Sequence, residues 1–305
     1  MTATVLVIGA GRHGRTGARV VEQLRAQGRN VRVLVRSGGA YVDELRAQGA
    51  DVVTGDLLDR RTLGAAVDGV DAVYFAYPIA AGAVAAAANL ASVLRAAHRS
   101  PHLVVLSMGP SAADSPSALG RAQWAAEEVF VWAGLEPTVL RVAALFYENI
   151  LVLHGSSIKE SGRIANSFGP GKAPWISGRD AADLAVAALL EPDRYPAAKL
   201  TYPPGAELLS HAEVAELIAK EVASPVEFTA ISAPQWQAEL EELAKSGDVV
   251  NPAMAQHISS VGAQLAQRSG AAIPPDPGHL AEIIGHPPLT MVEFIRHHRE
   301  ALRRS

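Results

Sequence analysis

Short apolar runs and helical patterns alternate regularly through the first half of this chain. The runs are rich in Val, Ile and Leu and contain few polar residues, as strands buried on both faces do. Five such runs lie at Thr4–Ile8, Val31–Val35, Asp51–Thr54, Ala72–Tyr77 and Leu103–Leu106. A strand–helix–strand repeat at this spacing predicts parallel strands joined by right-handed crossovers. The expected fold class is therefore α/β, with a doubly wound parallel sheet.

The second half of the chain is less regular and reads as mostly helical. Arg179–Leu190 has the pattern of a helix, and Lys199–Tyr202 reads as a late strand that returns to the sheet. We therefore expect a sheet domain followed by a smaller, mostly helical C-terminal lobe. The predicted boundaries are residues 1–152 plus about 177–203 for the sheet domain, and residues 153–176 and 204–305 for the lobe.

The composition excludes several classes of function. With 27 basic and 31 acidic side chains the net charge is −4, which does not favour nucleic acid or an anionic membrane as a partner. The chain has no cysteine, so disulfides and thiolate chemistry are excluded, and its ten histidines show no metal-ligand spacing, so no metal site is predicted. The N-terminus lacks the features of a signal peptide, and the longest apolar stretch, Ala80–Leu94, is too short to cross a bilayer. We expect a cytoplasmic protein.

A glycine-rich turn follows the first predicted strand. It fits G-x-G-x-x-G as Gly9, Gly11 and Gly14, and it also fits G-x-x-G-x-x-G when the pattern ends at Gly17. Glycine allows a tight turn and a close approach to a pyrophosphate, and the following helix start presents free N–H groups to the anion. At the first βα turn this pattern predicts a Rossmann domain that binds a dinucleotide. The residues assigned to the cofactor here are Gly9, Gly11, Arg12, His13, Gly14, Arg15 and Thr16.

The residue at the end of the second predicted strand indicates which dinucleotide to expect. A site for NAD usually has an acidic residue about 20 positions after the glycine turn, where it holds the ribose 2′-hydroxyl. In this chain that position is Arg36, followed by Ser37. A guanidinium suits a 2′-phosphate through paired charge-assisted hydrogen bonds, and Arg12 offers a second charge. We therefore predict that the cofactor is NADP(H).

Further stretches carry a family resemblance over nearly the whole chain. They are Gly14-Arg-Thr-Gly17, Val31–Arg36, Thr54–Leu57, Leu63–Asp71, Leu106-Ser107, Gly134–Arg141, Phe146–Asn149, Asp180–Ala185 and Ile284–Thr290. In this order they resemble the NmrA-like branch of the atypical short-chain dehydrogenases/reductases. The resemblance implies a Rossmann domain that binds NADP(H), a small C-terminal lobe, and a small-molecule substrate in the cleft between them.

The same resemblance implies which residues lie beside each part of the cofactor. They are Asp56 and Leu57 for the adenine, Ala76, Tyr77 and Pro78 for the riboses, and Ala143, Ala144 and Phe146 for the nicotinamide. The chain departs from the family in two places. Gly9-Ala10 stands where many members have only a Thr, and the loop after Arg141 lacks the usual Pro and is one residue longer.

Typical short-chain dehydrogenases carry a Tyr-x-x-x-Lys pair on the helix after the fifth strand. The Tyr protonates the carbonyl oxygen of the substrate, and the Lys lowers the pKa of that Tyr and holds the ribose. On the matching helix, Ala118–Trp132, the two positions are Leu119 and Gln123. Leucine transfers no proton and glutamine supplies no charge, although Gln123 can still hydrogen-bond the nicotinamide ribose.

Two functions of different class remain open. One is a reductase whose acceptor needs no strong acid, such as a quinone, an activated alkene or a cationic dye, because the hydride chemistry belongs to the cofactor. Its candidate proton donors are Tyr77, Ser107, Tyr147 and His154. The other is a regulatory protein that senses NADP(H) without turnover and binds a protein partner. The missing Tyr and Lys favour the sensor, whereas a lobe able to form a roomy pocket favours the enzyme, which we prefer by a small margin.

Overall fold

The computed structural model describes residues 3–10, 16–142, 145–194, 199–200, 205–246, 250–268 and 274–304. The chain divides into two compact units. The first unit comprises residues 1–113, 122–141 and 181–201, and the second comprises residues 114–121, 142–180 and 202–305. The large sheet belongs to the first unit.

Seven parallel strands form this sheet, in the order β10-β6-β5-β4-β1-β2-β3. They are β1 Thr4–Ile8, β2 Asn30–Val35, β3 Asp51–Thr54, β4 Ala72–Phe75, β5 His102–Ser107, β6 Thr138–Arg141 and β10 Lys199–Leu200. The chain runs outward from β1 to β3, then crosses to β4 and continues in the opposite direction, as in a Rossmann sheet. The predicted α/β fold with a doubly wound parallel sheet is confirmed.

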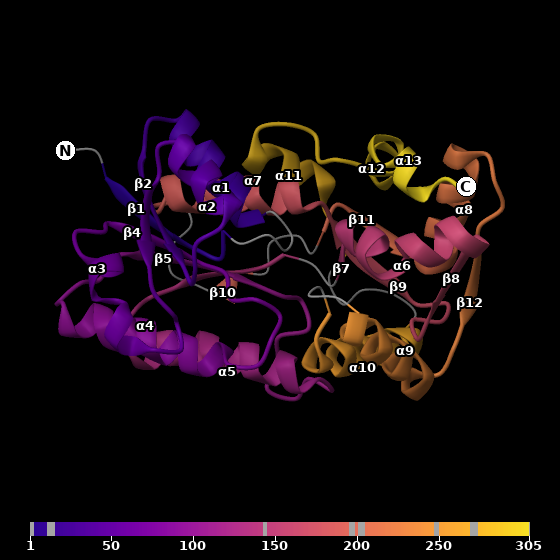
Figure 1. The fold of residues 1–305 in the computed structure, drawn as a ribbon, viewed down its shortest axis with the longest axis horizontal. Helices are drawn as coiled ribbons and strands as arrows, with labels where there is room; N and C mark the ends of the chain where they lie inside the picture. The colour runs from indigo at the N-terminus through magenta and orange to yellow at the C-terminus, as the bar shows by residue number, and fades with distance from the viewer. Residues whose placement is uncertain are drawn as a thin grey trace. The chain divides into compact units, whose positions relative to one another are not determined.

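Helices cover both faces of this sheet (Figure 1). The helical segments are α1 Thr16–Ala26, α2 Ala40–Ala47, η1 Arg60–Thr62, α3 Gly64–Val67, α4 Ala83–Ala96, α5 Ala118–Trp132 and α7 Gly178–Leu190. Helices α1, α2 and α7 lie on one side, and α4 and α5 lie on the other. Because both faces are covered, β4 is buried at every position, and Phe75 at its end meets Phe130 of α5 edge-on at 5.1 Å between ring centroids.

One predicted strand ends early. The apolar run from Ala72 continues to Tyr77 in the sequence, but β4 stops at Phe75. Pro78 has no N–H for a ladder, and it restricts the backbone of the residue before it. The N–H of Ala76 still reaches the carbonyl of Ile8, at 3.1 Å, so the chain leaves the sheet just beyond this residue.

The second unit contains two small sheets and most of the C-terminal helices. One sheet has the order β11-β9-β7 and the other pairs β12 with β8. The strands are β7 Leu145–Phe146, β8 Arg163–Asn166, β9 Lys172–Ile176, β11 Glu207–Ser210 and β12 Glu227–Ala230. The helices are α6 Glu148–Ser161, α8 His211–Val222, α9 Ala233–Ser246, α10 Pro252–Ala266, α11 Pro277–Ile284, α12 Met291–His297 and α13 Arg299–Leu302.

Local signals in the sequence set the helix starts of this unit. Ser210 begins α8 and Thr290 begins α12, each with a capping box closed by a Glu three residues later. The apolar faces of these helices, which include Phe294 of α12, pack with Trp175 and Phe168, and all three aromatic side chains are almost fully buried. Among the residues that the structure describes, no helix has the length and apolar character needed to span a membrane.

Candidate functional site

The carboxyl ends of four strands meet at one edge of the sheet in the first unit. Ile8 of β1 lies opposite Leu34 of β2 and Phe75 of β4, so the residues that follow these strands share that edge. They include Gly9, Arg36, Asp56 and Ala76. The strand order reverses between β1 and β4, and ligands of doubly wound sheets bind at such a point. This edge is therefore the candidate site.

Two glycines allow the backbone to pack closely at this edge. A Cβ on Gly9, which has a φ of +98°, would lie 2.2 Å from the carbonyl oxygen of Ala76. A Cβ on Gly17 would lie 2.4 Å from the carbonyl oxygen of Gly9, so α1 packs directly against the end of β1. Close helix–strand packing is the role of the third glycine in a dinucleotide-binding turn, which favours the alignment that ends at Gly17.

The rest of the predicted turn is only partly described. Thr16 is the first residue of α1 and is buried. The predicted cofactor residues Gly11, Arg12, His13, Gly14 and Arg15 lie outside the described residues.

Arg36 follows β2 with its side chain exposed, and Ser37 beside it is exposed as well. Among the described residues, none accepts a hydrogen bond from the Arg36 guanidinium. The charge of Arg36 affects Tyr77, which follows a neighbouring strand. The pKa of Tyr77 is raised chiefly by burial and further by Asp56, while Arg36 lowers it. The three side chains therefore lie close enough to interact electrostatically.

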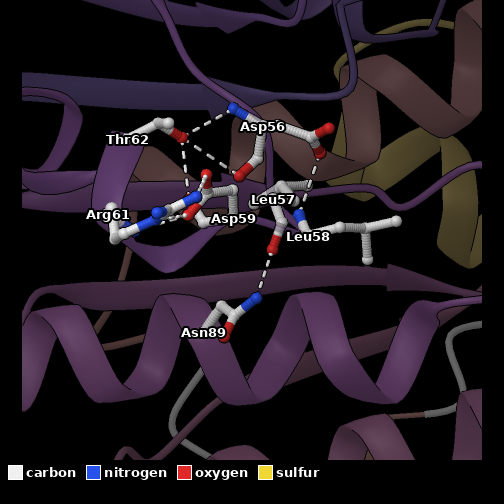
Figure 2. A network of polar contacts seen from close by, with 7 residues as sticks. All are labelled: Asp56, Leu57, Leu58, Asp59, Arg61, Thr62 and Asn89. Carbon is white, nitrogen blue, oxygen red and sulfur yellow. Dashed lines mark hydrogen bonds and ion pairs between the residues drawn. The ribbon is translucent and has the colours of Figure 1, made fainter.

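A compact loop holds the predicted adenine-contacting residues (Figure 2). The N–H of Asp56 donates to Oγ1 of Thr62 at 2.8 Å, and its Oδ1 accepts from the N–H of Leu58 at 2.9 Å. The carbonyl of Leu57 accepts from Nδ2 of Asn89 on α4, also at 2.8 Å. These bonds fix the backbone that follows β3, so the protein's own contacts hold Asp56 and Leu57 at the edge.

The predicted ribose-contacting residues follow β4. Ala76 and Tyr77 are half-buried and Pro78 is exposed. The hydroxyl of Tyr77 donates to the carbonyl of Ala81 at 3.2 Å. A Cβ on Gly82 would lie 2.7 Å from that hydroxyl oxygen, so the ring lies against the start of α4. The hydroxyl proton of this candidate donor is therefore engaged by the protein's own backbone.

Ser107, another candidate donor, belongs to a buried network that sequence reasoning missed. Its hydroxyl donates to Glu127 on α5, a carboxylate that also binds Ser111 and Arg141. Glu127 is fully buried. The sequence could have revealed this network. The helical period places Glu127 on the same side of α5 as Leu119 and Phe130, which are buried. A carboxylate on an apolar helix face indicates a partner or a function.

The two helix positions that replace Tyr and Lys are both buried. Leu119 is 7% exposed and Gln123 is 5% exposed. Nε2 of Gln123 has no hydrogen-bond partner among the described residues. A buried amide without an acceptor costs about 1–3 kcal/mol, so this donor fits a polar group of a bound ligand, such as a ribose hydroxyl. The predicted role of Gln123 in binding the cofactor is compatible with this geometry.

The predicted nicotinamide-contacting residues belong to the second unit. Phe146 ends β7 and is half-buried, whereas Ala143 and Ala144 lie outside the described residues. Tyr147 is fully buried, and its hydroxyl donates to Oε2 of Glu207 at 2.6 Å. Burial, followed by this hydrogen bond, raises the pKa of Tyr147 well above its usual value. The hydroxyl proton of Tyr147 is therefore bound by Glu207, and the raised pKa makes Tyr147 a weak acid.

A small cavity in the second unit is surrounded by aromatic rings and two buried histidines. His154 stacks on Trp236 at 5.3 Å between ring centroids, and His211 packs edge-on to Trp175 at 5.2 Å. Burial lowers the pKa of His154 to about 4 and that of His211 well below its usual value. Nε2 of His154 lies 3.3 Å from Nδ2 of Asn166, which can only donate, so this nitrogen accepts. Both rings are neutral near pH 7.

Comparisons with known proteins agree with this architecture. The model of the NmrA-like family matches residues 1–268. The NAD(P)H azoreductase of Xenophilus azovorans is 30% identical over 310 residues, covering 97% of this chain and 98% of that protein. An NADPH-dependent quinone oxidoreductase of Escherichia coli, solved with NADPH, has a TM-score of 0.79 at 20% identity, covering 96% of this chain and 99% of that one. The triphenylmethane reductase of Citrobacter sp., solved with NADP(H), has a TM-score of 0.75 at 20% identity, covering 97% and 99%. At such identities the two solved structures are similar in fold.

Proposed function

Because this chain belongs to the NmrA-like family, we propose that it is an NADPH-dependent oxidoreductase that transfers hydride to a quinone or a similarly activated acceptor. The family resemblance inferred from the sequence is confirmed by the match over residues 1–268. Relatives named for azo, quinone and triphenylmethane substrates support this class of acceptor, because all three substrate types delocalise the incoming electrons.

The observation that carries the proposal is the sheet edge between β1 and β4, with Arg36 beside it. Gly9 and Gly17 let the backbone pack closely at this edge, where an added Cβ would clash with main-chain atoms, and an exposed guanidinium stands where an NAD site has an acid. In the proposal Arg36 binds the 2′-phosphate and Gln123 binds the nicotinamide ribose. Bound NADPH supplies the hydride, and the protein supplies binding, orientation and exclusion of water.

The state of the candidate proton donors supports an activated acceptor. The hydroxyls of Tyr77, Ser107 and Tyr147 all donate to groups of the protein itself, and His154 is neutral. A simple ketone would become an alkoxide that needs an acid, and general-acid assistance is worth about 10²–10⁴ in rate. A quinone spreads the charge over ring and oxygen, so solvent or a weak donor suffices.

The test is an assay of NADPH oxidation with quinones, azo dyes and enones against simple aldehydes and ketones. We expect turnover with the activated acceptors and none above background with the simple carbonyls. Rapid reduction of a plain ketone would show that a strong proton donor exists. Tight NADPH binding without turnover of any acceptor would favour the alternative, a regulatory protein that senses NADP(H) and binds a protein partner. The domain boundaries, the place of the acceptor and the cytoplasmic location stay predictions of the sequence.

A further inference from the structure

The carboxylate of Glu127 is a convergence point for polar groups in the first unit. Ser107 and Ser111 both donate their hydroxyls to its Oε1, with 2.6 Å between Oγ of Ser111 and that oxygen. Nε of Arg141 donates to Oε2 at 3.2 Å, and Nη2 donates to the same oxygen. The proposed function assigns Glu127 itself no role, yet burying a charge is costly unless its partners are well placed.

The direction of the protons in this network follows from elementary chemistry. An ionised carboxylate carries no hydrogen, so each serine must be the donor in its bond to Glu127. The guanidinium of Arg141 compensates the buried negative charge. A hydroxyl has only one hydrogen, so Ser107 retains only its lone pairs for any other partner. While Glu127 is ionised, Ser107 can accept a further hydrogen bond but cannot donate one.

The network lies at the edge of the sheet where a ligand is expected. Ser107 ends β5 and lies opposite Arg141, which ends β6. Gln123 precedes Glu127 by about one helical turn, so the two residues share a side of α5. Ser107 is 6% exposed, and Nε2 of Gln123 is buried with no hydrogen-bond partner among the residues that the structure describes. Together they offer one hydrogen-bond acceptor and one donor.

We propose that Glu127 is a positioning residue that holds Ser107 as a hydrogen-bond acceptor for a hydroxyl of the nicotinamide ribose, opposite the donor of Gln123. This inference rests on the proposed function. A ribose diol matches such a pair because each hydroxyl both donates and accepts. The arrangement removes Ser107 from the list of proton sources for the substrate, and it gives the buried carboxylate a part in binding the cofactor.

The experiment compares Ser107→Ala with the matched control Ser111→Ala, because each removes one hydroxyl from the same oxygen of Glu127. Calorimetry measures NADP⁺ and adenosine 2′,5′-bisphosphate, which lacks the nicotinamide ribose. Ser107→Ala should raise the Kd of NADP⁺ about tenfold, or 1.4 kcal/mol, and leave that of the bisphosphate within about twofold. Ser111→Ala should leave both within about twofold.

Two further measurements separate positioning from catalysis and from folding. Glu127→Gln should raise the Kd of NADP⁺ by a similar factor and leave that of the bisphosphate unchanged. The reason is that an amide N–H can donate to Ser107, which lets the hydroxyl of Ser107 turn its proton outward. If Glu127→Gln does not fold, the comparison of Ser107→Ala with Ser111→Ala decides the question. The kcat of Ser107→Ala should fall by less than the ~100-fold expected from loss of a general acid.

An unchanged Kd for NADP⁺ in Ser107→Ala would overturn the inference, as would equal losses in the two serine variants or a kcat loss of 100-fold or more. Failure of the unmodified protein to bind NADP⁺ at all would instead overturn the proposed function, and this inference with it.

Discussion

Gly17 offers a sharp test of the cofactor turn, because a single added methyl group meets only backbone there. The Cβ of Gly17→Ala would lie 2.4 Å from the carbonyl oxygen of Gly9 and 2.7 Å from Cα of Ala10. Neither atom can rotate aside, so α1 must move by about 1 Å relative to β1 to restore ordinary contact. Overpacking of this kind costs about 1–3 kcal/mol, and the helix preference of Ala over Gly offsets up to about 1 kcal/mol.

The matched control is Gly64→Ala at the start of α3, where an added Cβ meets no atom within 4 Å. Urea unfolding should show Gly17→Ala to be less stable by about 1–2 kcal/mol and Gly64→Ala to be unchanged or slightly more stable. Calorimetry should show NADPH bound at least about tenfold more weakly by Gly17→Ala, because the helix N-terminus that faces the pyrophosphate has shifted. A Gly17→Ala protein with the stability and NADPH affinity of the unmodified protein would show that the close contact between α1 and β1 is not required.

Three other substitutions test separate parts of the account. Arg36→Asp should weaken the binding of NADPH about 10- to 100-fold, or 1.4–2.8 kcal/mol, in calorimetry, while Arg46→Asp on the exposed side of α2 should leave it unchanged. Equal affinity of the unmodified protein for NADPH and NADH would contradict the assignment of Arg36 to the 2′-phosphate. Burial lowers the pKa of His154 and of His257 to about 4, so both are neutral when folded, whereas the unfolded chain takes up protons near pH 6.5. The free energy of unfolding should therefore be greatest above pH 6.5 and fall by up to about 3 kcal/mol per histidine towards pH 4. His154→Gln should flatten that fall in urea titrations, and an unaltered slope would show that the ring is not held neutral. Tyr147→Phe should lower the free energy of unfolding by about 1–2 kcal/mol, because Glu207 loses a buried hydrogen bond, and thermal unfolding unchanged from the parent would count against that bond.

Most strands of the first unit could be predicted from the sequence because they are short runs rich in Val, Ile and Leu, although β6 was not among the predicted strands. β1 and β3 occupy the predicted residues, β2 begins one residue earlier than predicted, and β5 extends one residue further at each end. The strands of the small sheets in the second unit do not stand out in the sequence as apolar runs of this kind. β8 and β12 are four residues each and pair Arg163 with Glu227, far apart in the sequence. Short strands with distant partners have neither the length nor the periodicity that sequence reasoning needs.

The residues of the candidate site also differ in whether the sequence could predict their surroundings. Arg36 lies just after a strand and Gly17 lies at a helix start, so their positions followed from the local pattern. The bonds of Glu127 depend on how β5 and β6 pair with each other and with α5, which no local pattern contains. Tyr147 was a plausible proton donor in the sequence, but its burial against Glu207 depends on a strand 60 residues away.

The proposed function requires this protein to carry hydride from NADPH to an activated acceptor. The most direct test is a single-turnover experiment in which the preformed complex with NADPH is mixed rapidly with a soluble quinone under anaerobic conditions. We expect the absorbance of the reduced nicotinamide to disappear in step with formation of the hydroquinone, one equivalent for each bound NADPH. A complex that keeps its NADPH fully reduced in the presence of quinones, azo dyes and enones alike would show that this protein is not such a reductase.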